Sequence, residues 1–286
     1  MIGVLNINKP KGVTSSQVVV KIKKTLNLKK VGHMGTLDPL AFGVLPICVG
    51  KATRLFDYFL KKKKTYVAQF KFGEETDSLD LEGNIIKTSS NIPNKEQIEN
   101  TIKSFLGQTK QVPPAYSAKK IDGKKAYDLA RQGQAVTLKP CDIFLYEYKL
   151  LSQISSNIFE FYITCSAGTY IRCLARDLGE KLNSCATMVS LKRIKSGPFC
   201  IEKAIDYHSI SKEVLENNIM PLNEVLIDFE KLIISKQDFQ KLLNGLNVVV
   251  KNKNEKTDYA IVCENEIIGI GNINNNILKL KTYLHQ

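Results

Sequence analysis

The sequence has no tryptophan, only three histidines, and no C-x-x-C pair among its seven cysteines. The histidines (His33, His208 and His285) are not at metal-ligand spacing, which argues against a zinc site. Scattered cysteines are typical of the reduced, buried thiols of a cytoplasmic protein. No run of about 18 apolar residues occurs, so no membrane span is expected. The N-terminal residues also lack the pattern of a secretory signal.

Nucleotide-cofactor motifs are absent as well. The stretch from Gly43 to Gly50 resembles a phosphate-binding P-loop, but its glycines are two residues too far apart. Ala52 also stands where that motif needs Ser or Thr, and no G-x-G-x-x-G occurs. We therefore expect neither a cofactor nor a metal, and side chains must carry any chemistry.

Positive charge is the feature of the composition that indicates a partner. The chain holds 41 Lys and Arg against 28 Asp and Glu, a formal net charge of +13. The lysines cluster at 29–30, 61–64, 119–120 and 124–125. This balance favours a nucleic-acid partner, although a solvated, lysine-rich surface would give the same composition.

Hydrophobic periodicity predicts helices and strands that intermix without a β-α-β rhythm, which favours an α+β fold. Strands are expected at 4–8, 65–73, 136–151, 158–166, 188–194, 247–251, 259–263, 267–273 and 277–282. Helices are expected at 15–27, 52–60, 95–106, 126–131, 170–183 and 236–243, with Thr14 or Ser15 capping the first and Thr169 the fifth. Segment 107–133 looks like a basic insertion, and the short strands beyond a boundary near 226–231 indicate a small β-barrel.

The stretch G-H-M-G-T-L-D-P-L-A-F-G at residues 32–43 places one carboxylate, Asp38, directly before Pro39 and among three glycines. Glycine permits backbone angles that other residues avoid, and proline restricts both itself and the residue before it. Such a segment can hold Asp38 at a defined point on a loop, where functional side chains are often found. An ordinary Asp-Pro turn has the same signature.

Two further residues could act together with Asp38. An aspartate can serve as a nucleophile or electrostatic stabiliser at a sugar carbon, and a neighbouring arginine keeps it ionised. Arg172 is expected in the first turn of its helix, and Tyr66 begins a strand after four lysines, where it could stack on a base or act as a weak base. Taken singly, Arg172 could equally form a surface ion pair and Tyr66 belong to the core.

Six blocks in the same order resemble the TruB family of tRNA pseudouridine synthases, the enzymes that act on uridine 55 in the T-loop. The blocks are residues 3–12, 32–43, 64–66, 113–118, 168–172 and 191–193, and the resemblance covers nearly all of residues 1–200. It implies an isomerase, an intramolecular transferase that needs no cofactor because nothing is oxidised and no group is gained. It also implies a pseudouridine synthase fold, with a central, mainly antiparallel sheet flanked by helices and a small C-terminal PUA-like β-barrel.

The resemblance implies three catalytic residues. Asp38 matches the aspartate that attacks the target nucleotide, and Arg172 matches the arginine that pairs with it. Tyr66 matches the tyrosine that stacks on the flipped uracil and can take a proton from the ribose. Attack at C6 of the base, attack at C1′ of the sugar and elimination through a glycal all stay open.

Four more residues are implied in substrate binding. Tyr170 and Leu191 match residues that line the uracil pocket, and His33 matches the histidine that engages the T-loop near the flipped base. Lys9 matches a lysine that supports the active-site loop. Phe42 stands where the family usually has a small residue, so the packing beside Asp38 is expected to differ.

The implied organisation is a catalytic domain over 1–228, with a basic thumb-like insertion at about 108–140, and a PUA-like RNA-binding domain over 229–286. The expected partner is the T-arm of tRNA, without a membrane or a guide RNA, and the chain is expected to be a cytoplasmic monomer. Three rivals remain: a non-catalytic tRNA-binding or folding protein, a guide-RNA-dependent synthase and a synthase acting on ribosomal RNA.

Overall fold

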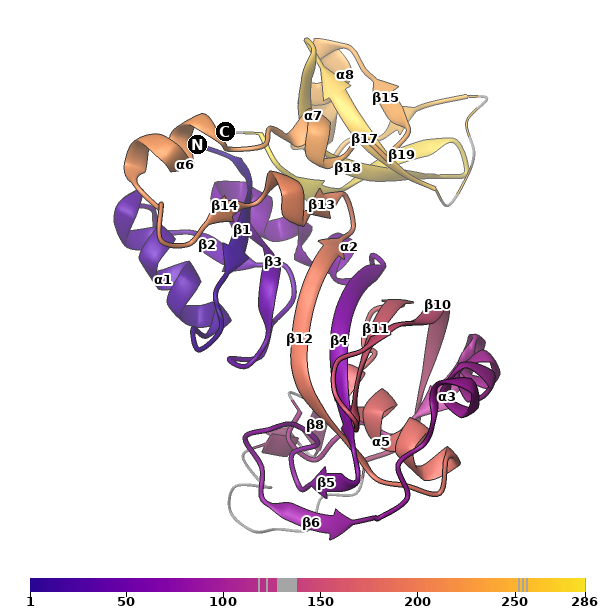
Figure 1. Cartoon of the computed structure of the whole chain (residues 1–286). Coiled ribbons are helices and arrows are strands. Elements are labelled where there is room, and N and C mark those ends of the chain that lie inside the picture. The colour runs from indigo at the N-terminus through magenta and orange to yellow at the C-terminus, as the bar shows by residue number, and fades with distance from the viewer. Residues whose placement is uncertain are drawn as a thin grey trace.

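The computed structural model describes residues 1–117, 119–121, 123–127, 138–251, 253, 255 and 257–285. Its largest sheet has the strand order β14-β1-β3-β12-β4-β11-β10-β7, with β2 added to β3 and β13 to β12 (Figure 1). The strands are β1 (Gly3–Lys9), β2 (Val31–His33), β3 (Phe42–Val49), β4 (Lys64–Phe72), β7 (Gly107–Gln111), β10 (Cys141–Gln153), β11 (Ile158–Cys165), β12 (Ala186–Ser196), β13 (Phe199–Cys200) and β14 (Ile205–Asp206). Only the pairs β1 with β14 and β3 with β12 are parallel, which confirms the expected mainly antiparallel sheet.

The sheet is divided by a narrow seam between β3 and β12. These strands are joined at only two residue pairs, Phe42 with Lys192 and Gly43 with Arg193. Gly43 has a φ of +103°, and a Cβ at this position would collide with the carbonyl oxygen of Arg193, so the close approach requires glycine. Figure 1 shows β1, β2 and β3 on one side of the seam and β4, β11 and β10 on the other. The loop that carries Asp38 leads directly into the seam.

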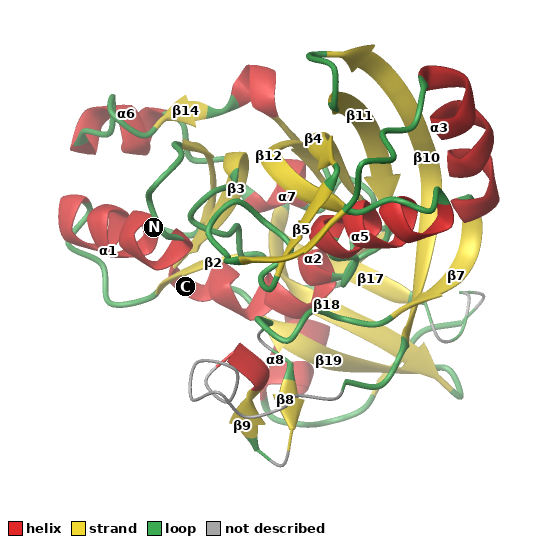
Figure 2. Ribbon diagram, turned by 60° about the horizontal axis from the view of Figure 1, so that its bottom comes forward, coloured by secondary structure: helices red, strands yellow, loops and turns green. Residues whose placement is uncertain are grey.

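Two helices cover one face of the half formed by β12, β4, β11 and β10 (Figure 2). They are α3 (Lys95–Ile102) and α5 (Ile171–Lys181). Alternate residues of β4 point into the core beneath them, from Tyr66 through Phe70 to Phe72, as the period-two pattern predicts. On the other half, α1 (Ser15–Thr25) begins at Thr14, whose side chain accepts a hydrogen bond from the backbone N–H of Gln17. The capping expected for this helix is confirmed.

The remaining elements are short. They are α2 (Phe56–Leu60), α6 (Lys212–Asn217), α7 (Leu222–Val225), the hairpin of β5 (Glu74–Thr76) and β6 (Ile85–Thr88), the hairpin of β8 (Lys120–Ile121) and β9 (Lys124–Lys125), and 3-10 turns at Gly50–Leu55, Lys103–Phe105 and Ile201–Lys203. No helix of the described residues is long and apolar enough to cross a membrane.

Several expectations need correction. Thr169 does not cap α5, because the N-cap is Tyr170, whose side chain makes no capping hydrogen bond. The helix expected at 52–60 is a 3-10 turn followed by α2, since Gly50, with φ of +64°, starts a tight turn. Segment 107–133 was expected to be a basic insertion, but it starts with β7, an edge strand paired with β10. The helix expected at 126–131 lies mostly outside the described residues.

A second, five-stranded sheet lies near the C-terminus, with the order β15-β17-β18-β19-β16 (Figure 1). Its elements are β15 (Lys231–Ile233), α8 (Lys236–Leu243), β16 (Val248–Val249), β17 (Asp258–Cys263), β18 (Glu266–Asn274) and β19 (Ile277–Tyr283). One apolar cluster joins the two sheets, because Ala260, Ile270 and Leu284 pack in the same core as Val4 and Phe59. The C-terminal sheet is thus fixed to the larger one through buried contacts.

Candidate active site

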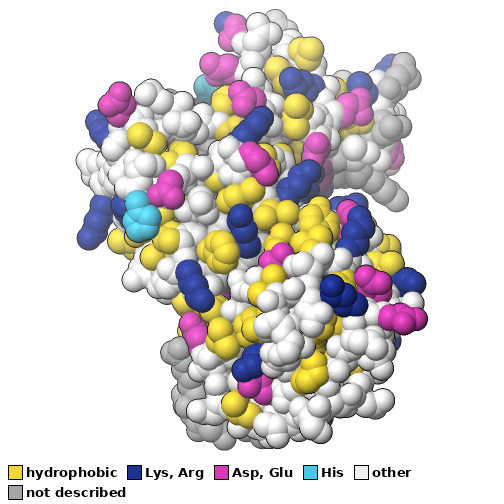
Figure 3. Space-filling model, viewed as in Figure 1, with side chains coloured by type: hydrophobic (Ala, Val, Ile, Leu, Met, Phe, Trp, Pro, Cys, Tyr) yellow, Lys and Arg dark blue, Asp and Glu magenta, His cyan; other side chains and the backbone are white. Residues whose placement is uncertain are grey.

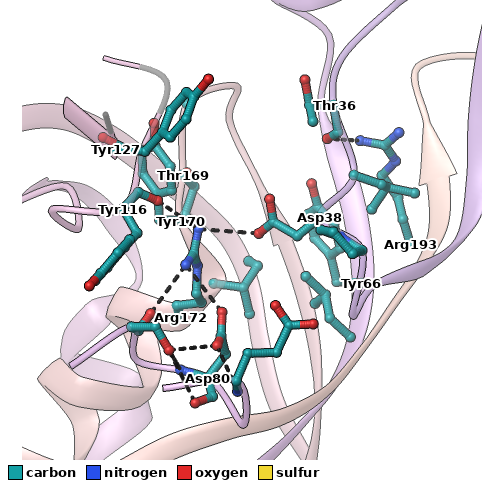
Figure 4. A pocket seen from close by; sticks show the side chains of 18 of the residues that line it. Thr36, Asp38, Tyr66, Asp80, Tyr116, Tyr127, Thr169, Tyr170, Arg172 and Arg193 are labelled. Carbon is teal, nitrogen blue, oxygen red and sulfur yellow. Dashed lines mark hydrogen bonds and ion pairs between the residues drawn. The ribbon is translucent and has the colours of Figure 1, made fainter. Parts of the chain in front are cut away.

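A cavity of about 710 Å³ opens where the Asp38 loop, the start of β4, the β5–β6 connection and the start of α5 meet (Figure 4). Five of the seven residues predicted for the site line this cavity: Asp38, Tyr66, Tyr170, Arg172 and Leu191. Lys9 and His33 lie outside its walls. The sequence blocks that carry these five residues are far apart in the chain, and the fold brings them to one place.

Arg172 is the central cation of the cavity. Its guanidinium lies 3.2 Å from a carboxylate oxygen of Asp38 and 3.1 Å from one of Asp80 (Figure 4). It also donates to the backbone carbonyls of Ser78 and Tyr116, each at 3.1 Å. The Arg172 and Asp80 side chains are less than a tenth exposed, whereas 41% of the Asp38 side chain is accessible. Arg172 is therefore held in place by buried partners. It pairs with the accessible carboxylate of Asp38, which faces the cavity.

Arg193 fixes the backbone on the other side of Asp38. Its side chain is almost fully buried, and it donates to the carbonyls of Val44 at 2.7 Å, Gly35 at 3.2 Å and Thr36 at 3.4 Å. The loop before Asp38 is thereby tied to β12 across the seam. Burial raises the pKa of the neighbouring Tyr66 phenol to about 12, although the positive charge of Arg193 opposes the rise. Tyr66 is therefore a neutral phenol near pH 7.

Tyr170 and Leu191 form apolar walls of the cavity. Gln111 holds the backbone of Tyr170 with two hydrogen bonds, accepting from its N–H at 2.8 Å and donating to its carbonyl at 3.1 Å. Burial raises the pKa of the Tyr170 phenol. Leu191 is buried on β12, two residues before Arg193. Edge strand β7, which carries Gln111, therefore positions one wall of the site.

Lys9 supports the Asp38 loop from behind. Its ammonium donates to the carbonyls of Val13 at 2.6 Å, Pro10 at 3.0 Å and Pro39 at 3.5 Å. Burial lowers the pKa of Lys9 to about 8. Pro39 directly follows Asp38, so Lys9 acts on the loop through backbone contacts.

His33 lies at the end of β2, at the N-terminal side of the same loop. Its buried Nδ1 atom has no hydrogen-bond partner among the described residues, and burial lowers the pKa of its imidazole. Within the part of the chain that the structure describes, no group of three or more His, Cys, Asp or Glu side chains is placed to hold a metal ion.

Two residues of the site were not predicted from the sequence. No motif marks Asp80 in the sequence, and its role comes from its burial, because a buried acid needs a cation and Arg172 is that cation. Arg193 belongs to the block that also carries Leu191, yet its burial was not visible in the local pattern, which shows only a basic residue on a strand.

Comparison with known families shows to which family the chain belongs. Residues 23–171 match the model of the TruB family pseudouridylate synthase N-terminal domain, and residues 172–233 match that of the tRNA pseudouridylate synthase B C-terminal domain. The chain belongs to the TruB family of pseudouridylate synthases.

Relatives of this TruB-family chain extend over nearly its whole length. It is 39% identical over 289 residues to tRNA pseudouridine synthase B of Clostridium novyi (strain NT), covering 99% of this chain and 100% of the relative. It is also 43% identical over 280 residues to tRNA pseudouridine synthase B of Mycoplasma mobile (strain ATCC 43663 / 163K / NCTC 11711), covering 97% and 93%.

Among solved structures, the chain is similar to "Crystal Structure of a Cbf5-Nop10-Gar1 Complex", with a TM-score of 0.76 and 27% identity over 99% of this chain and 85% of that one. It is also similar to "Structure of H/ACA RNP bound to a substrate RNA containing 2'-deoxyuridine", with a TM-score of 0.75, 25% identity and the same coverage. Together with the family match, these likenesses confirm the predicted pseudouridine synthase fold.

Proposed function

We propose that this TruB-family chain isomerises uridine to pseudouridine at position 55 in the T-loop of tRNA, and that Asp38 is the residue that attacks the target nucleotide. The observation that carries the proposal is the accessible Asp38 carboxylate, paired with buried Arg172 at 3.2 Å and facing a cavity of about 710 Å³. The names of the relatives support a tRNA substrate.

The reaction breaks the N1–C1′ bond of the uridine, turns the uracil and joins C5 to C1′, while C5 loses a proton and N1 gains one. No electrons are exchanged with a second reactant, and the atoms of the substrate balance those of the product. Because a stacked base cannot enter the cavity, the uridine must first flip out of the RNA. Asp38 would then attack C6 of the base or C1′ of the sugar, or assist elimination through a glycal.

In this proposal the walls of the cavity hold the flipped base. Tyr66 stacks on the uracil from β4, while Tyr170 and Leu191 close the pocket around it. A phenol with a pKa of about 12 is protonated at neutral pH, which suits stacking. To take a proton from the ribose, Tyr66 would have to be a phenolate beforehand and would end as the neutral phenol. The charge of Arg193 favours that phenolate, because it opposes the rise of the phenol pKa that burial causes.

Lys9 and His33 would act outside the cavity. Lys9 holds the backbone beside Asp38 through the carbonyl of Pro39. His33, at the end of β2 and on the N-terminal side of the Asp38 loop, would engage the T-loop next to the flipped nucleotide.

We further propose the domain division predicted from the sequence, with a catalytic domain over 1–228 and a PUA-like RNA-binding domain over 229–286. The five-stranded C-terminal sheet supports the second part. The chain would act as a monomer on tRNA without a guide RNA; the thumb-like segment predicted at about 108–140 lies partly outside the described residues.

Pseudouridine mapping tests the proposal. Unmodified tRNA transcript is incubated with the full chain or with Asp38→Asn, and Asp57→Asn, an exposed acid on α2, serves as a matched control. We expect modification of the T-loop uridine by the wild type and by Asp57→Asn. We expect Asp38→Asn to fold and bind tRNA but to form no pseudouridine. Substantial turnover by Asp38→Asn would exclude the nucleophile role, and tRNA binding without modification by the wild type would favour the folding-protein alternative.

A further inference from the structure

The exposed charges of the molecule do not by themselves define a path for RNA. Figure 3 shows lysine and arginine side chains scattered over one face, with acidic side chains among them. Exposed cations of this kind are individually weak and strongly screened by salt. Buried cations are more informative, because a charge removed from water is costly unless it has a partner.

Lys64 is such a buried cation. It begins β4 and lines the cavity, and only 6% of the residue is exposed. Its ammonium donates to the backbone carbonyls of Leu60 at 2.6 Å and Lys62 at 2.9 Å, at the end of α2. No carboxylate of the described residues pairs with it. Two of its three N–H donors are thus used, and its charge is unbalanced.

The neighbourhood of Lys64 increases this imbalance. Burial lowers the pKa of Lys64 to about 8, and the guanidinium of Arg193, which is also a cation, acts in the same direction. Of the described carboxylates that line the cavity, Asp38 and Asp80 pair with Arg172, and none forms an ion pair with Lys64. The wall at Lys64 therefore carries positive charge without a protein anion.

The position of Lys64 matches one nucleotide. Lys64 and Tyr66 are two residues apart on the same strand face, which separates them by about 7 Å. If Tyr66 stacks on the flipped uracil, the phosphate groups next to that nucleotide lie within reach of the wall at Lys64. A phosphate oxygen would accept the remaining N–H donor and supply the missing negative charge.

We propose that the Lys64 ammonium binds one of the two phosphates that flank the flipped uridine, and so sets the depth at which the nucleotide enters the cavity. This inference rests on the proposed function, because it assumes an RNA nucleotide in the cavity. Lys64 is a positioning residue and takes no part in bond making. Its hydrogen bonds to the end of α2 hold the ammonium ready for the phosphate.

A binding cycle with neutralised phosphates tests this role. The RNA is a fluorescently labelled T-arm hairpin, used with natural linkages or with a neutral methylphosphonate at the 5′ or at the 3′ phosphate of the target uridine. The full-chain proteins are the wild type, Lys64→Met and Lys64→Arg. Lys63→Met is the matched control, because it removes the exposed neighbouring lysine. Dissociation constants come from fluorescence anisotropy, and thermal unfolding shows that each variant is folded.

We expect one methylphosphonate to weaken wild-type binding about tenfold or more, as befits a lost charge-assisted hydrogen bond. Lys64→Met should bind natural RNA about as weakly as the wild type binds the RNA with that methylphosphonate. The same methylphosphonate should not weaken RNA binding by Lys64→Met any further. Lys63→Met should be as sensitive to the methylphosphonate as the wild type, and Lys64→Arg should show part of that sensitivity. If Lys64→Met stays as sensitive to both linkages as the wild type, Lys64 does not contact a phosphate and only caps α2.

Pseudouridine formation on the natural hairpin is measured in parallel. A wild type that binds with the expected pattern but forms no pseudouridine would contradict the proposed function and leave the phosphate contact standing. Active wild type combined with an unchanged sensitivity of Lys64→Met would overturn the Lys64 proposal alone.

Discussion

Breaking the buried ion pair between Arg172 and Asp80 should lower stability strongly, and neutralising both partners should recover much of the loss. In Arg172→Met the Asp80 carboxylate, 7% exposed, keeps its bonds to the Ser78 hydroxyl at 2.6 Å and the Glu82 N–H at 3.1 Å but loses its cation. An uncompensated buried charge costs about 3–5 kcal/mol. For a chain of this size that is a fall in the melting temperature on the order of 10 °C.

The double variant Arg172→Met/Asp80→Asn separates charge from packing. The amide oxygen that replaces the Asp80 carboxylate would still accept from Ser78 and Glu82, so no buried charge is left, and we expect recovery of at least about 2 kcal/mol. Arg176→Met is the control one turn later on α5, because Arg176 pairs with a more exposed acid, Asp177, and should cost about 1 kcal/mol or less.

Thermal unfolding gives the stabilities, and pseudouridine formation gives the activities. Both variants without Arg172 should be inactive, since Asp38 loses the same cation. If the double variant is less stable than Arg172→Met, with the two losses simply adding, Asp80 does not depend on the charge of Arg172 and the account of the site is wrong.

Three further outcomes follow from the geometry. Gly43→Ala should lower the free energy of unfolding by at least about 1–3 kcal/mol, because of the φ of +103° at Gly43 and the collision with Arg193. Gly32→Ala, where the added Cβ would meet only one atom at 3.9 Å, should leave the melting temperature nearly unchanged. Equal melting temperatures for the two variants would contradict the close approach of β3 and β12 at Gly43. Tyr66 has a pKa of about 12 when folded and about 10 when unfolded, so its contribution to stability is complete below pH 10 and is lost as the pH rises towards 12. Absorbance titration of wild type minus Tyr66→Phe should show a phenol ionising near pH 12, and ionisation near pH 10 would argue against its burial. A chain that ends at residue 228 should melt at a clearly lower temperature than the full chain, because it loses Ala260, Ile270 and Leu284 from the shared core. An unchanged melting temperature would show that the larger sheet does not depend on the C-terminal sheet for its stability.

The sequence predicted the strands best where alternation is strict. The strand expected at 65–73 is β4 at Lys64–Phe72, and the helix expected at 236–243 is α8 with the same bounds. Both segments have a local pattern that tertiary contacts reinforce. The capping of α5 was wrong because Tyr170 is held by Gln111, about 60 residues away in the chain, and a local rule cannot see that contact.

The site was predicted in part for a similar reason. Asp38, Tyr66 and Arg172 stand in recognisable blocks, and their meeting in one cavity follows from the fold. Asp80 and Arg193 gain their importance from burial, which depends on contacts between segments far apart in the chain. Burial of a charged side chain leaves little trace in a single sequence, since the same residue on a surface looks identical.

The seam between β3 and β12 makes the active site sensitive to the angle between the two halves of the sheet. Asp38 lies on the loop that leads into β3, whereas Arg172 lies on α5, which packs on β12 and β4. Besides the two residue pairs of the seam, the hydrogen bonds of Arg193 on β12 tie the Asp38 loop to the second half. A small rotation about the two residue pairs of the seam would change the Asp38–Arg172 separation without altering any side-chain rotamer. We therefore expect substitutions that change this angle to alter turnover even where they do not line the cavity.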